Sequence, residues 1–388
     1  MEPSHVPFID LEPWVEKVSG DFNSSNRFGI DVTRLLLSRE FLGGGPTTKK
    51  LEARLSEKLG VPHVVTCANG TDALQLALRA CGIDRGSRVA MPNLTFWATY
   101  EAIVNVGATP VLIDIDPDDR QMSFDDFKRA HDEKRFDAAI LVHLYGWCSS
   151  RLTEFRTFCR ERRITLIEDG AQAFGVELDG QNVFADADVA TLSFHPAKVL
   201  GALGDGGAVL TKTARVAERV RALGNHGRAG SGQHTHVAVG WNSRLDAIQA
   251  VWLLRGLDVI DEVIEARRKL RDLYVTWLAA ITYDYNPAHH VRSPAYPGIT
   301  TNGYMTTLVR TNQPPADIVI RRLAEQSIEA RRIYPYTIAD QSQGNAIQYG
   351  PLYHSRKLAE NIISLPLYYG MPEEYVECCV QAYVEAVK

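Results

Sequence analysis

One lysine stands at a position in this sequence that suits covalent chemistry. Lys198 follows an apolar run typical of a strand and leads into a glycine-rich stretch that ends at Gly207. Glycines let backbone segments approach closely, so this lysine can be held at the floor of a pocket. The acidic pair Glu168 and Asp169 ends another apolar run upstream. A lysine and a carboxylate at neighbouring strand ends are two groups that a pyridoxal phosphate enzyme needs, for its Schiff base and its pyridinium nitrogen.

Each of these two residues also has a plain structural interpretation when it is taken alone. Lys198 can be a surface lysine, and Asp169 can form an ordinary salt bridge or cap a helix. Because a strand end is where a ligand-binding side chain is expected in an α/β protein, the pair still predicts a binding site.

Two further segments match the remaining parts of such a cofactor. Gly70, Thr71 and Asp72 precede a helical pattern, and a helix start offers N–H groups, a hydroxyl and the helix dipole to a phosphate. Phe96 follows the apolar run that ends at Pro92, where an aromatic side chain can cover a planar ring. The alternatives are a simple helix cap for the first segment and a core position for the second.

The spacing of apolar residues predicts the elements that would bring these groups together. From about residue 60 to 212, short apolar runs alternate with amphipathic, helical patterns. The predicted strands are 63–68, 88–92, 109–115, 137–144, 164–168, 189–194 and 207–211, and the clearest helices are 72–81, 96–106 and 153–162. This alternation predicts an α/β fold in which helices cover both faces of a mostly parallel sheet.

The C-terminal third of the chain has a different pattern. A long helix is predicted from 243 to about 281, then a loop-rich stretch to about 303, a strand at 304–310, and helices at 316–326 and 373–387. We therefore expect an N-terminal arm and a large cofactor-binding domain over residues 1–245. Connecting helices and a smaller α+β domain are expected over residues 246–388. The first 40 residues should pack on the large domain as an arm or a helix.

The composition argues against several other classes of protein. The 388 residues carry a net charge of −5 and a pI near 6.1, which gives no bulk attraction to nucleic acid or to a membrane surface. No apolar run approaches the roughly 20 residues of a membrane span, and the N-terminus lacks the pattern of a signal peptide. Six scattered cysteines fit a reducing, cytoplasmic location. His234 and His236 have no third ligand nearby in the sequence, so no metal site is expected.

The order of the motifs closely resembles that of the DegT/StrS family of sugar aminotransferases, which are fold-type-I pyridoxal phosphate enzymes. The resemblance covers about residues 39–370. The matching motifs are Asn69–Leu74, Thr95–Thr99, Val142–Gly146, Glu168–Ala173, Ser193–Gly207, Asn225–Gly227, Gly240–Leu245 and Leu365–Leu367. It implies a large domain built on a mostly parallel sheet and a smaller C-terminal α+β domain.

The resemblance also implies a role for each residue that matches a family motif. Lys198 matches the Schiff-base lysine, and Asp169 matches the partner of the ring nitrogen. Gln172 matches the residue beside the phenolic oxygen of the cofactor. Phe96 matches the aromatic residue stacked on the ring, with Tyr100 as a nearby candidate.

The phosphate of the cofactor has its own set of matching residues. Thr71, with the backbone of Gly70 and Asp72, matches the phosphate-binding cup, and Ser193 joins it. Asn242 matches the asparagine that reaches the phosphate from the neighbouring subunit. That role implies an obligate homodimer with shared active sites.

The resemblance specifies the substrate contacts less closely. The candidates are His195, Tyr145, His226 and Tyr334. His195 stands where a tyrosine is commoner in the family, and the chain matches the family poorly after residue 282. The identity of the sugar therefore stays open.

The implied reaction is amino transfer from an amino acid, with L-glutamate as the expected donor, to a keto-sugar carried on a nucleotide. The product would be an amino sugar for polysaccharide or secondary-metabolite biosynthesis. The alternatives are a free keto-cyclitol as acceptor, a sugar dehydratase of the same family, and a non-catalytic regulatory protein on the same fold. The dehydratases carry His where this chain has Lys198. A regulatory protein could have lost Lys198, Asp169 or Gln172, and all three are present.

Overall fold

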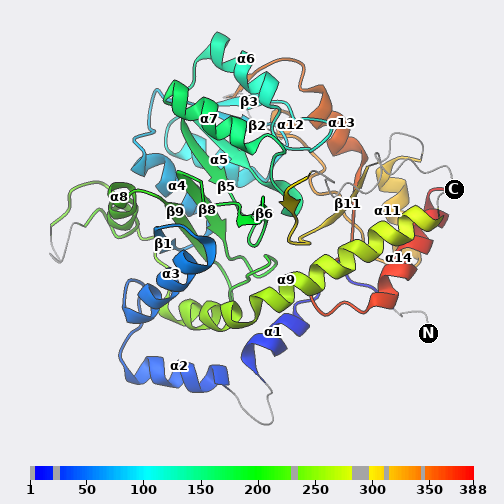
Figure 1. Ribbon diagram of the computed structural model, residues 1–388, viewed down its shortest axis with the longest axis horizontal. Helices are drawn as coiled ribbons and strands as arrows, with labels where there is room; N and C mark the ends of the chain where they lie inside the picture. Colours follow the sequence, from blue (N-terminus) through cyan, green and yellow to red (C-terminus); the bar gives the residue numbers. More distant parts are fainter. Residues whose placement is uncertain (1–4, 21–26, 229–234, 282–296, 310–313, 342–345) are drawn as a thin grey trace.

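The core of the protein is an eight-stranded sheet (Figure 1). The computed structural model describes residues 5–20, 27–228, 235–281, 297–309, 314–341 and 346–388. From one edge to the other, the strands are β1 (His63–Cys67), β9 (Gly207–Thr211), β8 (Val189–Ser193), β5 (Thr165–Asp169), β4 (Ala138–Val142), β2 (Arg88–Pro92), β3 (Thr109–Ile113) and β12 (Ile347–Gln348).

The sheet is parallel except around β9. That strand pairs antiparallel with both β1 and β8, whereas all pairs from β8 to β12 are parallel. The connection from β8 to β9 turns back over the carboxyl end of β8, and Phe194 N–H donates to the Gly206 carbonyl at 2.8 Å. This connection contains Lys198, so the reversed strand places the lysine loop over the end of the sheet.

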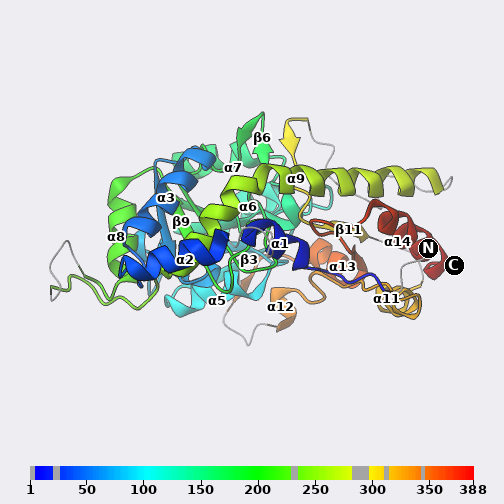
Figure 2. The same cartoon turned by 90° about the horizontal axis from the view of Figure 1, so that it is seen from below.

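Helices cover both faces of the sheet, as the alternating pattern predicted (Figures 1 and 2). One face packs against α4 (Gly70–Ala80), α5 (Trp97–Asn105) and α8 (Ala214–Gly224). The other face packs against α3 (Pro46–Leu59), α6 (Phe124–Lys134), α7 (Leu152–Arg162) and the first half of α9 (Ala247–Ile281). Strands buried on both faces explain the continuous apolar runs in the sequence.

A second, separate core forms around the far half of α9, which extends away from the sheet in Figure 1. There Tyr274 and neighbouring apolar residues pack against α11 (Ala316–Glu325) and α14 (Glu373–Ala386). The antiparallel pair β11 (Thr306–Val309) and β13 (Ile362–Leu365) completes this core. No helix in the part of the chain that the structure describes is long and apolar enough to span a membrane.

The predicted strands of the large sheet all form, with ends that differ by two residues at most. The strand predicted from residue 304 begins at Thr306. Several short elements were not predicted. They are a small sheet formed by β6 (Glu177–Leu178), β7 (Gln181–Asn182) and β10 (Ile299–Thr300), the edge strand β12, and the helices α12 (Ile338–Gln341) and α13 (Tyr353–Asn361). Much of the stretch predicted to be loop-rich, 282–296, lies outside the described residues. The division at residue 245 stays a prediction.

The N-terminal segment contacts both cores. Helix α1 (Glu12–Ser19) packs on the large core through Trp14, whose indole N–H donates to the Gly201 carbonyl at 3.2 Å. α2 (Arg27–Leu37) packs on α9. Before α1, Val6 N–H donates to the Ser327 carbonyl at 2.9 Å, and Glu329 N–H donates to the Val6 carbonyl at 3.0 Å. The N-terminal segment therefore contacts the large core through Trp14 and the C-terminal part through Val6.

Candidate active site

A cavity of about 580 Å³ opens at the carboxyl ends of the central strands. The candidate residues that line it are Gly70, Thr71, Phe96, Asp169, Gln172, Ser193, His195, Lys198 and Tyr334. The candidates outside its lining are Asp72, Tyr100, Tyr145, His226 and Asn242. Residues from the ends of β1, β2, β5 and β8 thus meet at one place, as parallel strands require.

Lys198 is held by its own loop. Its N–H donates to the His195 carbonyl at 2.8 Å, and the half-buried Nζ donates to Tyr304 Oη at 3.4 Å. The loop closes tightly enough that a Cβ on Gly201 would collide with the Pro196 carbonyl. Only glycine fits there, which explains part of the glycine-rich sequence after the lysine.

Asp169, the last residue of β5, is buried, with only 6% of its surface exposed. Its Oδ1 accepts the Ala171 N–H at 3.0 Å, and its Oδ2 accepts the Thr99 hydroxyl at 3.4 Å. Burial raises the pKa of Asp169, although the Ala171 N–H and the charge of Lys198 act against that rise. Since Asp169 forms no ion pair with another described residue, a cation from a ligand would fit beside it. A protonated pyridine nitrogen is such a cation.

Gln172 is fixed at both ends of its side-chain amide. Its Oε1 accepts the Tyr145 N–H at 2.6 Å, and its Nε2 donates to Tyr334 Oη at 3.1 Å. The Tyr334 ring lies 5.8 Å from the Phe96 ring, which is 57% exposed. The Tyr145 side chain is fully buried beside Trp147 and does not line the cavity, so Tyr145 acts on the site through its backbone.

The start of α4 forms the floor of the cavity near β1. Asn69 caps the helix because its Oδ1 accepts the Asp72 N–H at 2.7 Å. The Asp72 amide is therefore already engaged, whereas the amides of Gly70 and Thr71 have no carbonyl partner within the helix. Ser193 lies directly against Gly70, since a Cβ on that glycine would be 2.8 Å from Ser193 Cβ. These groups fit a phosphate, and Asp72 contributes through the cap that it completes.

His226 and Asn242 lie away from this cavity in the same chain. Both are exposed and follow α8, where Asn225 and Asn242 form an isolated antiparallel bridge. His226 N–H donates to the Trp241 carbonyl at 2.9 Å. Asn242 Oδ1 accepts from the Arg244 guanidinium at 2.8 and 3.0 Å.

Sequence reasoning missed several residues from distant segments. Tyr304, Met305, Arg331 and Ile333 also line the cavity. Tyr304 is positioned by the buried Asn302, whose Oδ1 accepts the Tyr304 N–H at 2.8 Å and whose Nδ2 donates to the Gln172 carbonyl at 2.9 Å. No periodic pattern marks these residues, because they lie in loops and short extended segments of the C-terminal part.

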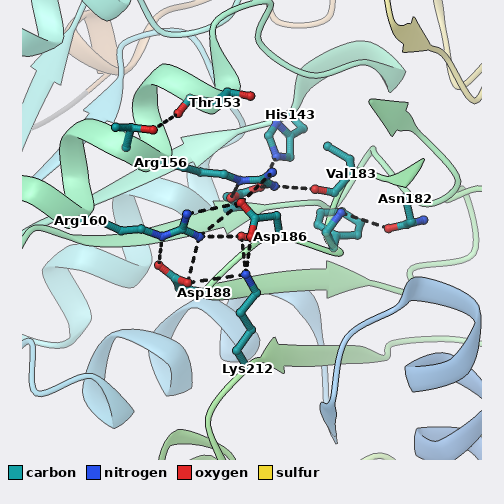
Figure 3. Close-up of polar contacts among 12 residues, drawn as sticks. His143, Thr153, Arg156, Arg160, Asn182, Val183, Asp186, Asp188 and Lys212 are labelled. Carbon is teal, nitrogen blue, oxygen red and sulfur yellow. Dashed lines mark hydrogen bonds and ion pairs between the residues drawn. The ribbon is translucent and has the colours of Figure 1, made fainter. Parts of the chain in front are cut away.

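Glu168, the residue before Asp169, forms a buried ionic network with His143 and Arg156 (Figure 3). Glu168 accepts from Arg156 at 2.8 and 2.9 Å and contacts His143 Nε2 at 3.0 Å. Arg156 also donates to the Val183 carbonyl at 2.5 Å. Burial acts to raise the pKa of Glu168, but the hydrogen bonds from His143 and Arg156 outweigh it and hold that pKa below its usual range. Because Glu168 and Asp169 are adjacent on one strand, their side chains lie on opposite faces of the sheet.

Four charged residues form a second, exposed network beside Arg156 (Figure 3). Arg160 pairs with Asp188 at 3.0 Å and with Asp186 at 3.4 Å, and Lys212 pairs with Asp186 at 2.5 Å. As to metals, no group of three or more His, Cys, Asp or Glu in the described ranges is arranged to hold an ion. His234 lies outside those ranges.

Comparisons with known proteins agree with this geometry. The model of the DegT/DnrJ/EryC1/StrS aminotransferase family matches residues 25–384. The chain is 34% identical to a UDP-N-acetyl-3-dehydro-α-D-glucosamine 3-aminotransferase of Acidithiobacillus ferrooxidans, covering 96% of this chain and 95% of that protein. It is 33% identical to a dTDP-3-amino-3,4,6-trideoxy-α-D-glucose transaminase of Micromonospora megalomicea, covering 92% and 94%.

Two further similarities complete the comparison. The chain is 31% identical to a pleiotropic regulatory protein of Geobacillus stearothermophilus, with 98% of each chain covered. The solved structure of DesV from S. venezuelae, in complex with a ketimine intermediate, superposes with a TM-score of 0.88 at 29% identity over the whole of both chains. The chain therefore belongs to the DegT/DnrJ/EryC1/StrS aminotransferase family.

Proposed function

We propose that this protein transfers an amino group from L-glutamate to a keto-sugar carried on a nucleotide, with pyridoxal phosphate as its cofactor. The observation that carries the proposal is the shared cavity of Lys198 and Asp169, with the α4 start beside them. An amine, a buried carboxylate and an anion site are the three contacts that this cofactor requires. Relatives named for UDP-linked and dTDP-linked sugars support a nucleotide-linked acceptor.

Two residues of this chain would carry the proton transfers. When bound, pyridoxal phosphate supplies an acceptor for the electrons left on the donor α-carbon. Lys198 Nζ would hold the cofactor covalently before the donor arrives and, once free, would remove the proton from the donor α-carbon. The Asp169 carboxylate would hold the proton on the ring nitrogen.

The other residues of the cavity bind and orient. The Gly70 and Thr71 amides, with the Thr71 and Ser193 hydroxyls, bind the phosphate. Phe96 would cover one face of the ring, and Gln172, which is held by Tyr145 and Tyr334, would lie at the edge of the ring. We assign His195 and Tyr334, which line the cavity, to the substrate side.

We further propose a homodimer in which Asn242 and His226 act in the partner's site. Neither residue lines the cavity of its own chain, and both lie in an exposed segment. Large apolar side chains are exposed on and after α2 and beside Asn242: Ile30, Leu36, Leu37, Phe41, Leu42, Val237 and Val239. Leu37 is 78% exposed and Val239 81%, which is typical of surfaces that another protein covers.

The alternatives are less consistent with these residues. A dehydratase of the family carries His at the position of Lys198. A regulatory role, as in the named relative from Geobacillus, does not require that Lys198, Asp169 and Gln172 all be kept in one cavity. A free keto-cyclitol acceptor differs only in the absence of the nucleotide, and a cytoplasmic location stays a prediction.

The experiment begins with the cofactor. Purified protein mixed with pyridoxal phosphate should become yellow, and borohydride reduction should fix the label on the Lys198 peptide by mass spectrometry. Lys198→Ala should show neither result. A wild-type protein that stays colourless with added cofactor would refute the proposal.

The acceptor is then identified with the loaded enzyme. UDP-linked and dTDP-linked keto-sugars and a free keto-cyclitol are each incubated with L-glutamate, and the products are read by mass spectrometry. An aminated nucleotide sugar is the expected product. Amination of the cyclitol alone would contradict the nucleotide part of the proposal.

A further inference from the structure

We propose that Arg331 is the carboxylate-recognition residue for the amino donor and that the N-terminal arm, through Phe8, sets its orientation. This inference rests on the proposed function and adds a donor subsite to it. Arg331 lines the same cavity as Lys198. Among the described residues that line this cavity, Arg331 is the only arginine and Lys198 is the only lysine.

The guanidinium of Arg331 is oriented by an aromatic ring. Its Cζ lies 4.8 Å from the centre of the buried Phe8 ring, an arrangement stabilised by the attraction of a cation to an aromatic face. A guanidinium that stacks through its face keeps its N–H edge available, and that edge matches a carboxylate with two parallel hydrogen bonds. A lysine at this position would offer neither the plane nor the paired donors.

The backbone on both sides of this stack is fixed. Arg331 exchanges two hydrogen bonds with Ser364, at 3.0 and 2.7 Å. Phe8 is fixed because its N–H donates to Glu329 Oε2 at 3.2 Å and because Val6 forms its bridge to Ile328. The N-terminal arm and the segment around Arg331 therefore form one unit at the cavity, although they lie at opposite ends of the sequence.

The charges around Arg331 leave room for a second carboxylate. Among the described residues, its one ion-pair partner is Glu329, with Nη2 to Oε2 at 3.6 Å, which is too long for a hydrogen bond. The neighbouring Arg332 differs, since its guanidinium donates to the Ala359 and Pro335 carbonyls and to Asp317. Arg332 is thus committed to the fold, whereas the Arg331 side chain is 57% exposed beside the cavity.

The chemistry of the two substrates decides which one needs this cation. Every amino-acid donor carries a carboxylate on the carbon whose proton must reach Lys198 Nζ. A neutral keto-sugar, of the kind named for the relatives from Acidithiobacillus and Micromonospora, has no anion beside its reacting carbon, because its negative charge lies in the nucleotide. A carboxylate that enters the cavity loses water, and a fixed guanidinium compensates for that loss. Arg331 should therefore contribute more to the binding of the amino donor than to the binding of the sugar.

The test uses the cofactor-loaded enzyme and separates its two half-reactions. In Arg331→Gln, the L-glutamate concentration that half-saturates the donor half-reaction should rise about 10-fold, as expected for the loss of a charged hydrogen bond. The sugar half-reaction, started from the aminated cofactor, should keep its concentration dependence. Arg331→Lys should fall in between, and Phe8→Leu should raise the L-glutamate requirement by about 2-fold to 5-fold through the lost ring.

Binding without turnover gives an independent measurement. Calorimetry should show that glutarate, a dicarboxylate that cannot donate an amine, binds Arg331→Gln about 10-fold more weakly than wild type. Arg85→Gln, which changes an exposed arginine outside the cavity lining, is the matched control and should behave as wild type.

L-alanine as donor distinguishes the two carboxylates of L-glutamate. If the half-saturating donor concentration of Arg331→Gln rises equally for both donors, Arg331 binds the α-carboxylate. If it rises for L-glutamate alone, Arg331 binds the side-chain carboxylate.

Three results would overturn the inference. They are an unchanged donor requirement in Arg331→Gln, unchanged glutarate binding, or an equal loss in the sugar half-reaction, which would assign Arg331 to the nucleotide. Each is distinct from failure of the proposed function, in which the wild-type protein itself would not react with an amino donor.

Discussion

Lys198 Nζ and Tyr304 Oη lie 3.4 Å apart, and the Tyr304 ring centre lies 5.4 Å from the same nitrogen. Lys198 comes from the connection between β8 and β9, whereas Tyr304 comes from the segment just before β11. Asn302 joins the two regions, because it binds the Gln172 carbonyl and the Tyr304 N–H. The C-terminal part of the chain thus fixes the position of the amine that the large sheet presents.

Tyr304→Phe should slow the reaction without preventing cofactor binding. The change removes the acceptor for Nζ but keeps the ring, so the donor half-reaction should slow by about 2-fold to 10-fold, as expected for one net hydrogen bond. Stopped-flow absorbance of the loaded enzyme measures this rate. Tyr349→Phe, which removes a hydroxyl paired with Glu133 at an exposed position, is the control. Equal rates in both variants would contradict a positioning role for Tyr304.

Asp169→Asn should have opposite effects on activity and on the stability of the cofactor-free protein. Asparagine cannot hold a proton on the ring nitrogen, so turnover should fall on the order of 100-fold or more. Because burial raises the folded-state pKa of Asp169 above 3.8, the folded protein holds this proton more tightly than the unfolded chain does. The resulting stability is complete at low pH and is lost as pH rises through the raised pKa.

Thermal unfolding of the cofactor-free proteins at several pH values checks this sign. The melting temperature of Asp169→Asn should rise relative to that of wild type as pH increases, since the variant has no carboxyl group to ionise at this position. Addition of pyridoxal phosphate should reverse the order, because only the wild-type carboxylate gains a cationic partner. Parallel pH curves for the two cofactor-free proteins would argue against the raised pKa.

Glu168→Gln should destabilise the fold by about 3–5 kcal/mol, because it leaves buried Arg156 and His143 without their anion. The lowered pKa of Glu168 gives stability that is present above 4.5 and is lost as pH falls, so the difference from wild type should shrink in acid. Urea unfolding at pH 7 and at pH 4 measures the difference in unfolding free energy between the variant and wild type. Asp188→Asn, in the exposed network, should cost about 1 kcal/mol or less. A similar loss of unfolding free energy in both variants would show that the burial of the Glu168 network does not increase its contribution to stability.

Mixed dimers test the shared site. Lys198→Ala and Asn242→Ala should each be nearly inactive, but a dimer with one chain of each kind has one complete site. Random exchange of chains makes half of the dimers mixed, so the mixture should recover about a quarter of wild-type activity. Activity after co-refolding, compared with that of each variant refolded alone, provides the measurement. No recovery, with exchange confirmed by native mass spectrometry, would place Lys198 and Asn242 in the same chain's site.

The sequence predicted the large sheet well, because strands such as 88–92 and 207–211 are apolar runs bounded by polar or glycine residues. It also placed Asp169 and Lys198 together, since adjacent strand ends must meet. It did not predict Tyr304 or Arg331, because they reach the cavity through contacts such as those of Asn302 and Phe8, which depend on the packing of distant segments. The antiparallel β9 was missed because a buried strand has the same composition in either direction.

The two-residue strand β12 has a consequence for how the chain reaches this fold. It pairs with β3, which precedes it by more than half of the sequence, and it forms the last strand at that edge of the sheet. During synthesis at about 5–20 residues per second, the edge of β3 therefore stays exposed for about ten seconds or longer after it is made. An unpaired edge is a template for aggregation, and a very short final strand is one way to protect it. The edge of β3 is therefore unprotected until β12 leaves the ribosome, and the completed sheet ends in a strand too short to offer a long edge to another chain.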